Sequence, residues 1–275
     1  MIIRQTEPKG IAEKAIRDKT CRFRSLARLL TEHFLTWCWT FINKRAASGV
    51  DKISAREYET NLQTNVKEIV TRVKEKRYKA KLVRRQYIPY ASGKLLRPLD
   101  ISAIDDKLLQ TAVKIIMEAI YEQDFLPCSY GYRPYRGAQD AITDISNALT
   151  YGRYNYIVEA DIKGYFDNID HKILLDMLSL RIDDKVFTGL IRKWLKAGIL
   201  DTDGQVINPD TGTPQGEIIS PILANIYLHY ALDIWFEQEV KPSCRGQAYL
   251  CRYADDFICA FQYEVDAKRF YNTLG

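Results

Sequence analysis

The chain has 275 residues, 47% of them hydrophobic and 27% charged, a composition that excludes an intrinsically disordered protein and suits two modest lobes. Its most apolar stretch, residues 218–236, contains proline and several polar residues, and the first ten residues lack the apolar core of a signal peptide. The six cysteines include no C-x-x-C pair, so we expect reduced thiols in a cytoplasmic protein, with neither a zinc site nor a disulfide framework.

The net charge of +5 is unevenly divided along the chain. Residues 1–100 contain 23 Lys and Arg against 10 Asp and Glu, which gives +13, and residues 101–275 therefore carry −8. A basic first third followed by an acidic remainder is typical of a polyanion-binding surface joined to a cation-binding site. A solvated, charged helical surface is the alternative that the charge count leaves open.

The first half of the chain is predicted to be mainly helical. Apolar residues recur at three- and four-residue spacing in its helical stretches, and a capping box, Ser54-Ala-Arg-Glu57, opens the second of them. Apolar and polar residues alternate over residues 82–99 around an Ala-Ser-Gly turn, which predicts a β-hairpin. Helices are expected over residues 22–46, 54–77, 105–122 and 138–149.

Strands and helices alternate in the second half. An apolar run over residues 156–161 predicts one strand, and residues 249–261 predict two strands that meet at a tight turn. A second hairpin is expected over residues 201–213, and His171 is expected to cap a helix. Further helices are predicted over residues 185–197, 217–240 and 265–274. The predicted fold class is α+β: a helical basic lobe with a hairpin, then a small antiparallel sheet backed by helices.

Two acidic sites lie at the ends of predicted strands. Asp161 ends an apolar strand, and Asp255 and Asp256 occupy the turn between Tyr253 and Phe257. Adjacent aspartates between apolar strands raise each other's pKa unless a cation compensates their charge. If the strands are neighbours, the carboxylates form an oxygen site for Mg²⁺, and two ions about 3.5–4 Å apart would suit phosphoryl transfer. An ordinary hairpin turn is the alternative for the Asp-Asp pair alone.

Several motifs together resemble the reverse transcriptases, and most closely those encoded by bacterial group II introns. Tyr253-Ala-Asp-Asp256 is similar to their catalytic hairpin, and residues 161–171 are similar to their first metal-binding strand and turn. Residues 212–221 resemble the loop and helix that hold the nascent base pair. Their fingers segments are matched in order by Gly49-Val-Asp51, Ile88-Pro89, Gly93-Lys-Leu-Leu-Arg-Pro98 and Ser129-Tyr-Gly-Tyr-Arg-Pro134.

This resemblance covers residues 45–262 and implies the fingers and palm of a right-hand polymerase. Residues 1–100 would be a basic N-terminal extension and fingers, 101–150 the fingers helices that lead into the palm, and 151–275 the palm with its catalytic carboxylates. We expect the chain to be the fingers and palm of a longer protein, without the thumb and C-terminal regions of its relatives. Tyr90 and Asp100 depart from the family pattern, which usually has lysine and glycine there.

The resemblance implies that Asp161, Asp255 and Asp256 are catalytic. Asp161 and Asp255 would bridge two Mg²⁺ ions, with Mn²⁺ as a possible substitute, and the backbone carbonyl of Ile162 would be a further metal ligand. Asp256 would adjust the geometry of the metal or the primer end. Such ions lower the pKa of a primer 3′-hydroxyl and stabilise the charge on the α-phosphate.

Five residues are expected to bind the incoming nucleotide. Lys94, Arg97 and Arg85 on the first hairpin would reach the triphosphate, although each alone is also an ordinary strand charge. Phe166 would lie beneath the sugar and exclude a 2′-hydroxyl by steric clash, unless it is a core residue. Gln215 would pack against the template–nucleotide pair.

The implied function is an RNA-directed DNA polymerase that takes an RNA template, a DNA primer and deoxynucleotides. The parent protein would also bind group II intron RNA as a splicing cofactor (a maturase) and act in retrohoming. RNA contacts, with a solvated surface as the alternative, are expected from Lys14, Arg17, Lys19, Arg22, Arg24 and Arg28.

Three other functions are considered. A non-catalytic RNA-binding splicing factor would be expected to lose the carboxylates, which are intact here. An RNA-dependent RNA polymerase would be favoured by a small or polar residue at position 166, where this chain has Phe166. A reverse transcriptase of a retron or a defence system stays open, although Gly49-Val-Asp51 and the N-terminal helices favour the intron family.

Overall fold

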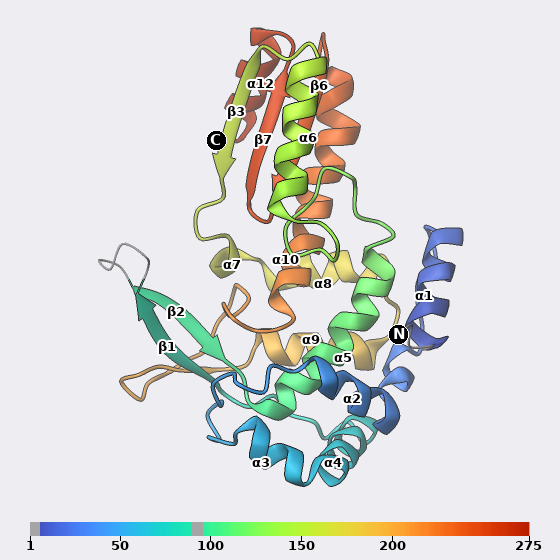
Figure 1. Ribbon diagram of the computed structural model, residues 1–275, viewed down its shortest axis with the longest axis vertical. Helices are drawn as coiled ribbons and strands as arrows, with labels where there is room; N and C mark the ends of the chain where they lie inside the picture. The colour runs from blue at the N-terminus through green and yellow to red at the C-terminus, as the bar shows by residue number, and fades with distance from the viewer. Residues whose placement is uncertain (1–5, 90–95, 275) are drawn as a thin grey trace. The chain divides into compact units, whose positions relative to one another are not determined.

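The computed structural model describes residues 6–89 and 96–274 (Figure 1). The chain divides into two compact units, and each unit is assembled from two separate stretches. The first unit contains residues up to 123 together with 166–220, and the second contains residues 124–165 together with 221–275. The functional lobes expected from the sequence, with boundaries at residues 100 and 150, stay a prediction.

The first unit is built around a long helix, α5 (Ile104–Tyr121), whose side chains are buried on most sides. This helix packs against α1 (Thr6–Arg17), α2 (Glu32–Cys38) and α4 (Leu62–Lys74). Further helices are α3 (Ala55–Thr60), α7 (Tyr165–Asn168), α8 (His171–Ser179) and α9 (Lys185–Leu195), with 3₁₀ turns at Leu26–Leu29 and Trp39–Phe41.

The prediction of one continuous helix over residues 22–46 is wrong. Ser25 adopts a left-handed conformation with a φ of 60°, so no α-helix passes through it. Thr31 then caps α2, because its hydroxyl group accepts a hydrogen bond from the Phe34 N–H. A 3₁₀ turn and a shorter helix therefore replace the predicted single element.

The predicted capping box is confirmed. The Ser54 hydroxyl accepts a hydrogen bond from the Glu57 N–H, and the Glu57 carboxylate accepts one from the Ser54 N–H at 2.8 Å. The helix that it opens is interrupted at Asn61, whose φ is −123°, and α4 follows directly. Residues 54–77 thus form two helices and not one.

The predicted hairpin of the first unit is also confirmed over its described part. Strands β1 (Val83–Pro89) and β2 (Leu96–Ile101) are antiparallel, and the tip at residues 90–95 lies outside the described residues. Strand β1 pairs in parallel with β4 (Ile199–Leu200), which pairs with β5 (Val206–Ile207). The hairpin expected over residues 201–213 is therefore formed by two short strands, β4 and β5, and ends earlier than predicted. The sheet order is β2-β1-β4-β5.

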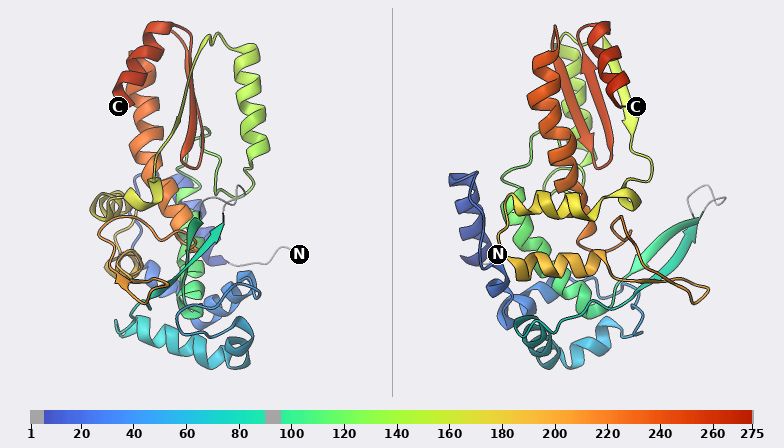
Figure 2. Two further views of the ribbon diagram at one scale, coloured as in Figure 1. Left: turned by 90° about the vertical axis from the view of Figure 1, so that its left-hand side faces the viewer. Right: turned by 180° about the vertical axis from the view of Figure 1, so that it is seen from behind.

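The second unit contains the three predicted strands. They form an antiparallel sheet of order β3-β7-β6, made of β3 (Tyr156–Asp161), β7 (Asp256–Phe261) and β6 (Ala248–Tyr253). Helix α6 (Ala138–Tyr151) covers one face, where Ala141 packs against Cys251. The other face packs against α12 (Glu264–Leu274) through Phe261 and Phe270 (Figure 2). The mixed helix and strand composition matches the predicted class.

The long helix predicted over residues 217–240 begins later and is not uniform. It starts as α10 (Ser220–Leu228), because the residues before it form a loop in which Gly216 has a φ of 109°. Two π-helical segments follow, His229–Asp233 and Phe236–Val240, and the helix ends as α11 (Lys241–Ser243). The first π segment contains Asp233, which is paired with a buried arginine of the sheet.

That arginine, Arg252 on β6, is fully buried and is the polar centre of the second unit. Its guanidinium group donates to both carboxylate oxygens of Asp233, at 2.7 and 2.6 Å. It also donates to the Asn225 side chain, the Ser129 hydroxyl and the Ala254 carbonyl, at 3.0, 2.8 and 2.8 Å. A buried charge with this many partners ties α10, the loop at residue 129 and the β6–β7 turn together.

We predict that Arg252→Ala lowers the free energy of unfolding by roughly 3–5 kcal/mol, because it leaves the Asp233 carboxylate buried without a compensating charge. Urea denaturation measures the change. Lys268→Ala is the control, since Lys268 forms an exposed pair with Glu264 on α12, and its midpoint should match that of the unmodified chain. Equal midpoints for both variants would contradict the structural role of Arg252.

Candidate active site

Two of the three predicted catalytic carboxylates lie directly opposite each other. Asp161 is the last residue of β3 and Asp256 is the first of β7, and their Cα atoms are partners in the antiparallel register. Cross-strand partners project to the same face of a sheet. Both side chains are exposed, at the end of a sheet whose inner residues are buried. The two strands that carry the acidic residues are therefore neighbours in the sheet, as the predicted metal site requires.

Asp255 occupies the turn that joins β6 to β7 and is half-buried. Ala254, directly before it, has a φ of 57°, a left-handed conformation that is uncommon for a residue other than glycine. Gly131 packs against this turn so closely that a Cβ atom there would lie 2.4 Å from the Ala254 nitrogen. The turn is also held by Arg252, which donates to the Ala254 carbonyl.

The electrostatics of the carboxylates favour a cation. Partial burial and the neighbouring charges of Asp161 and Asp255 raise the pKa of Asp256 above its ordinary value. Carboxylate oxygens are the ligands that Mg²⁺ prefers, so the donor chemistry fits a divalent ion. No three His, Cys, Asp or Glu side chains in residues 6–89 and 96–274 already converge as a metal site. The third oxygen predicted here, the Ile162 carbonyl, accepts a hydrogen bond from the Tyr165 N–H at 3.1 Å.

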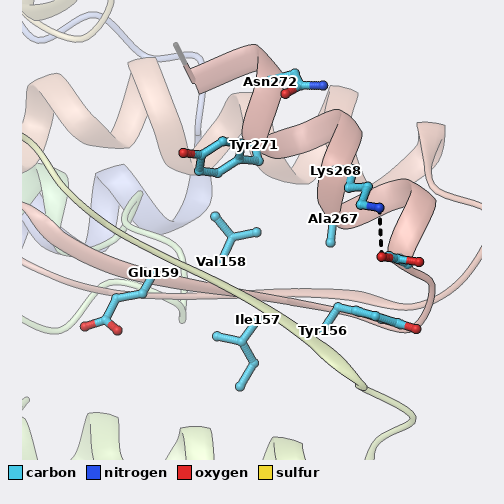
Figure 3. Close-up of a pocket in the computed structure, with 9 residues that line it drawn as sticks. Tyr156, Ile157, Val158, Glu159, Ala267, Lys268, Tyr271 and Asn272 are labelled. Atoms are coloured by element: carbon cyan, nitrogen blue, oxygen red, sulfur yellow. Dashed lines mark ion pairs between the residues drawn. The ribbon is translucent and has the colours of Figure 1, made fainter.

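A pocket of about 610 Å³ lies on β3 but not at the carboxylates. It is formed between β3 and α12, and neither Asp161, Asp255 nor Asp256 lines it (Figure 3). Val158 points toward α12, and Lys268 on that helix is ion-paired with Glu264 at 2.8 Å. The largely apolar lining offers no set of groups for phosphoryl transfer.

The candidate nucleotide-binding residues on the first hairpin have different environments. Arg97 is exposed on β2, and Lys94 lies outside the described residues. Arg85 forms a two-pronged ion pair with the buried Asp100, at 2.9 and 3.1 Å. Contact between Arg85 and a triphosphate would therefore use the N–H groups of Arg85 that Asp100 does not accept from. Asp100 is the family departure noted in the sequence, and the structure gives it this pairing role.

Phe166 and Gln215 belong to two connected segments of the first unit. The half-buried Phe166 accepts a hydrogen bond at its carbonyl from the Thr213 N–H at 2.7 Å, two residues before Gln215. His171 does not cap its helix, because the Asp170 carboxylate accepts the capping hydrogen bond. The His171 ring instead hydrogen-bonds the Gly212 carbonyl at 2.6 Å and so anchors the same loop.

The six candidate RNA-binding residues are all exposed. Arg24 is ion-paired with Asp183 at 2.9 Å, and Arg22 lies 3.8 Å from the same carboxylate. The Lys19 ammonium donates to the Gln123 carbonyl, and the Lys14 ammonium lies 5.6 Å from the centre of the Phe23 ring. These basic side chains are thus available at the surface, although Asp183 offsets part of the charge.

Sequence reasoning missed Arg252 and Asn225, which support the carboxylate turn, and it assigned Gly131 only to a fingers segment. A charged residue inside an otherwise apolar strand was the available signal for Arg252. Its partner Asp233 could not be identified, because it lies in a different element nineteen positions away.

Residues 88–275 match the family described as reverse transcriptase (RNA-dependent DNA polymerase). The chain belongs to the reverse transcriptase family. Its sequence is 45% identical over 167 residues to the group II intron-encoded protein LtrA of Lactococcus lactis subsp. cremoris, across 61% of this chain and 27% of LtrA. This reverse transcriptase chain therefore spans about a quarter of the length of LtrA.

Two further relatives extend the similarity over most of the chain. Protein YkfC of Escherichia coli K12 is 33% identical over 94% of this reverse transcriptase chain and 75% of its own length. A chain of the solved partial Cas6-RT-Cas1–Cas2 complex is 26% identical, with a TM-score of 0.51 over 87% of this chain and 38% of that one. No helix among the described residues has the length and apolar character needed to cross a membrane.

We predict that Mg²⁺ raises the melting temperature of the chain, because a ligand that binds only the folded state stabilises it. Asp161→Asn should raise the melting temperature without metal, since it removes a like charge beside Asp256, and should abolish the increase with Mg²⁺. Thermal melts with and without millimolar Mg²⁺ test both effects. Glu159→Gln, two residues earlier on β3, removes a weaker like charge near Asp256 and is the control that keeps the Mg²⁺ response. An equal response in Asp161→Asn would exclude Asp161 as a ligand.

Proposed function

We propose that this chain is the fingers and palm of an RNA-directed DNA polymerase of the group II intron type. The observation that carries the proposal is the position of Asp161 opposite Asp256, at the exposed end of the sheet, in a chain of the reverse transcriptase family. The fingers would lie within residues 1–150 and the palm, with its carboxylates, within residues 151–275.

The proposed mechanism assigns a role to each candidate. Asp161, Asp255 and the Ile162 carbonyl would hold two Mg²⁺ ions, or Mn²⁺, and Asp256 would adjust the geometry of the site. When bound, such ions lower the pKa of the primer 3′-hydroxyl and stabilise charge on the α-phosphate.

The remaining candidates would bind and select the nucleotide. Lys94 and Arg97 would neutralise the triphosphate, with Arg85 a weaker candidate because it is already paired with Asp100. Gln215 would pack against the nascent base pair, and Phe166 would exclude ribonucleotides. The exposure of Arg97 and the link between Phe166 and the Gln215 loop support these roles.

Extension of a DNA primer on an RNA template tests the polymerase directly. Asp161→Asn and Asp255→Asn should each reduce the extension rate by about a thousandfold or more, because metal stabilisation of transition-state charge is worth several kcal/mol. Glu159→Gln should extend at the rate of the unmodified chain. Absence of Mg²⁺-dependent extension by the unmodified chain, or full activity of the asparagine variants, would contradict the proposal.

Sugar discrimination tests the role of Phe166. Phe166→Ala should increase the kcat/KM for ribonucleotides relative to deoxynucleotides, because it removes a clash with the 2′-hydroxyl group. Single-nucleotide extension with each sugar gives the ratio. If Phe166 is a core residue, the ratio stays unchanged, and the variant loses roughly 3–5 kcal/mol of stability in a parallel melt.

The parent protein would also bind group II intron RNA as a maturase, which the 45% identity to LtrA and the six exposed basic residues support. Its affinity for an intron RNA should fall steeply with salt, because each neutralised phosphate releases counterions. Arg28→Glu should weaken binding and flatten the logarithmic slope, since no ion pair is formed by Arg28 in the described chain. An unchanged slope would indicate that these basic side chains form an ordinary solvated surface and do not contact RNA.

A reverse transcriptase of a defence system is the second candidate, favoured by the similarity to the Cas6-RT-Cas1–Cas2 chain. Preference for intron RNA over unrelated structured RNA of equal length would favour the maturase role. A cytoplasmic location stays a prediction from the sequence.

A further inference from the structure

The loop that contains Gln215 is fixed to the rest of the first unit on two sides. On one side, the Thr213 and Gly212 N–H groups donate to the carbonyls of Phe166 and Ile169, at 2.7 and 2.8 Å. On the other side, the Gln215 carbonyl accepts a hydrogen bond from the Asp100 N–H at 2.6 Å. Backbone hydrogen bonds thus hold the loop before Gln215 to the segment at residues 166–169, and Gln215 itself to β2.

The loop approaches β2 closely at the next residue. Gly216 has a φ of 109°, and a Cβ atom there would lie 2.7 Å from a Leu99 methyl group and 2.8 Å from the Asp100 carbonyl oxygen. After it, the Ile218 N–H donates to the Gln110 side chain of α5 at 3.2 Å. The residue between these two contacts is Glu217.

Glu217 places a carboxyl group inside the unit. It is 4% exposed, and the Ser102 hydroxyl donates to its Oε1 atom at 2.9 Å. No Lys, Arg or His side chain in the described part of the chain forms an ion pair with it. An ionised carboxylate in such a position is costly, because neither water nor a cation compensates its charge.

The charged groups that face Glu217 are themselves acidic or already paired, and its uncharged partners are the side chains of Ser102 and Gln110. Asp100 on β2 is 2% exposed and is bonded to Arg85 of β1. Asp106 on α5 is 3% exposed and accepts hydrogen bonds from the Tyr78 hydroxyl and the Lys81 N–H. The Lys81 ammonium is bonded to Asp51 at 2.9 Å and lies 3.4 Å from Asp105. The nearby cations thus have carboxylate partners of their own.

We propose that Glu217 is a positioning residue for Gln215: its neutral carboxyl group keeps the loop closed against β2 and α5, and opening of the loop releases its proton. This inference deepens the proposed polymerase function, because Gln215 is the residue proposed to contact the nascent base pair. The loop would then open more often as the pH rises.

The direction of the titration agrees with this arrangement. Burial, assisted by the charges of Asp106 and Asp100, raises the pKa of Glu217 from 4.5 to about 8. A raised folded-state pKa means that the closed loop binds the proton more tightly than the open loop. The preference for the closed loop is therefore complete below pH 4.5, declines as the pH rises, and reaches its minimum above pH 8.

Amide hydrogen exchange of the whole chain tests the proposal without requiring catalysis. After correction for intrinsic exchange, protection of the Ile218 and Asp100 N–H groups should fall by about tenfold per pH unit between about pH 5 and 8. Glu217→Gln, which keeps the shape but cannot ionise, should show no such dependence. Glu118→Gln is the matched control and should keep the pH dependence of the unmodified chain. Glu118 is a half-buried acid on α5 whose pKa is also raised by burial.

A second variant, Ser102→Ala, allows the test even if Glu217→Gln does not fold. Ser102→Ala removes a hydrogen bond that favours the ionised carboxylate, so the decline should extend to higher pH. The same slope in the unmodified chain and in Glu217→Gln, or no slope in either, would overturn the proposal. Failure to extend a primer, with the slope intact, would instead contradict the polymerase function and leave the Glu217 coupling standing.

Discussion

The ion pair between Arg252 and Asp233 is the interaction on which the second unit depends. Both side chains are completely buried, so each compensates a charge that the surrounding apolar groups could not tolerate alone. Because Arg252 lies on β6 and also donates to the Ala254 carbonyl, the same charge fixes the start of the β6–β7 turn. Asp255 and Asp256 follow this carbonyl directly. The position of the acidic turn is thus set from inside the unit, by contacts that do not involve the carboxylates of Asp255 and Asp256 themselves.

The support of the turn by residues other than the carboxylates matters because the carboxylates repel one another. The charges of Asp161 and Asp255 both raise the pKa of Asp256, so their clustering costs stability when no cation is bound. A strained residue at Ala254 and a close approach by Gly131 add further local constraints. The buried arginine network offsets these costs and holds the turn in a fixed geometry. In the first unit, the Gln215 loop is fixed in a comparable way by backbone hydrogen bonds, a left-handed glycine and the buried Glu217.

The sequence predicted the elements whose pattern is local. The strands at Tyr156–Asp161 and Asp256–Phe261 follow from apolar runs, one that ends at an aspartate and one that begins at an aspartate, and the capping box at Ser54 follows from residue types three positions apart. Features set by tertiary contacts were not predictable. The predicted helix is interrupted at Ser25 by a left-handed conformation that no glycine in the sequence signals, and His171 bonds Gly212 forty-one positions away. The pairing of Arg85 with Asp100 likewise depends on the strand register, which the hairpin pattern alone left open.

We propose that Asp161 and Asp255 share one metal site. Crystals of the chain with Mn²⁺ and a deoxynucleotide would test it most directly, because anomalous scattering locates the ion independently of the protein. We expect Mn²⁺ bound by carboxylate oxygens of both residues, with the Ile162 carbonyl as a further ligand. Carboxylates more than about 10 Å apart could not share ions spaced about 3.5–4 Å, so that separation, or Mn²⁺ bound elsewhere, would contradict the account.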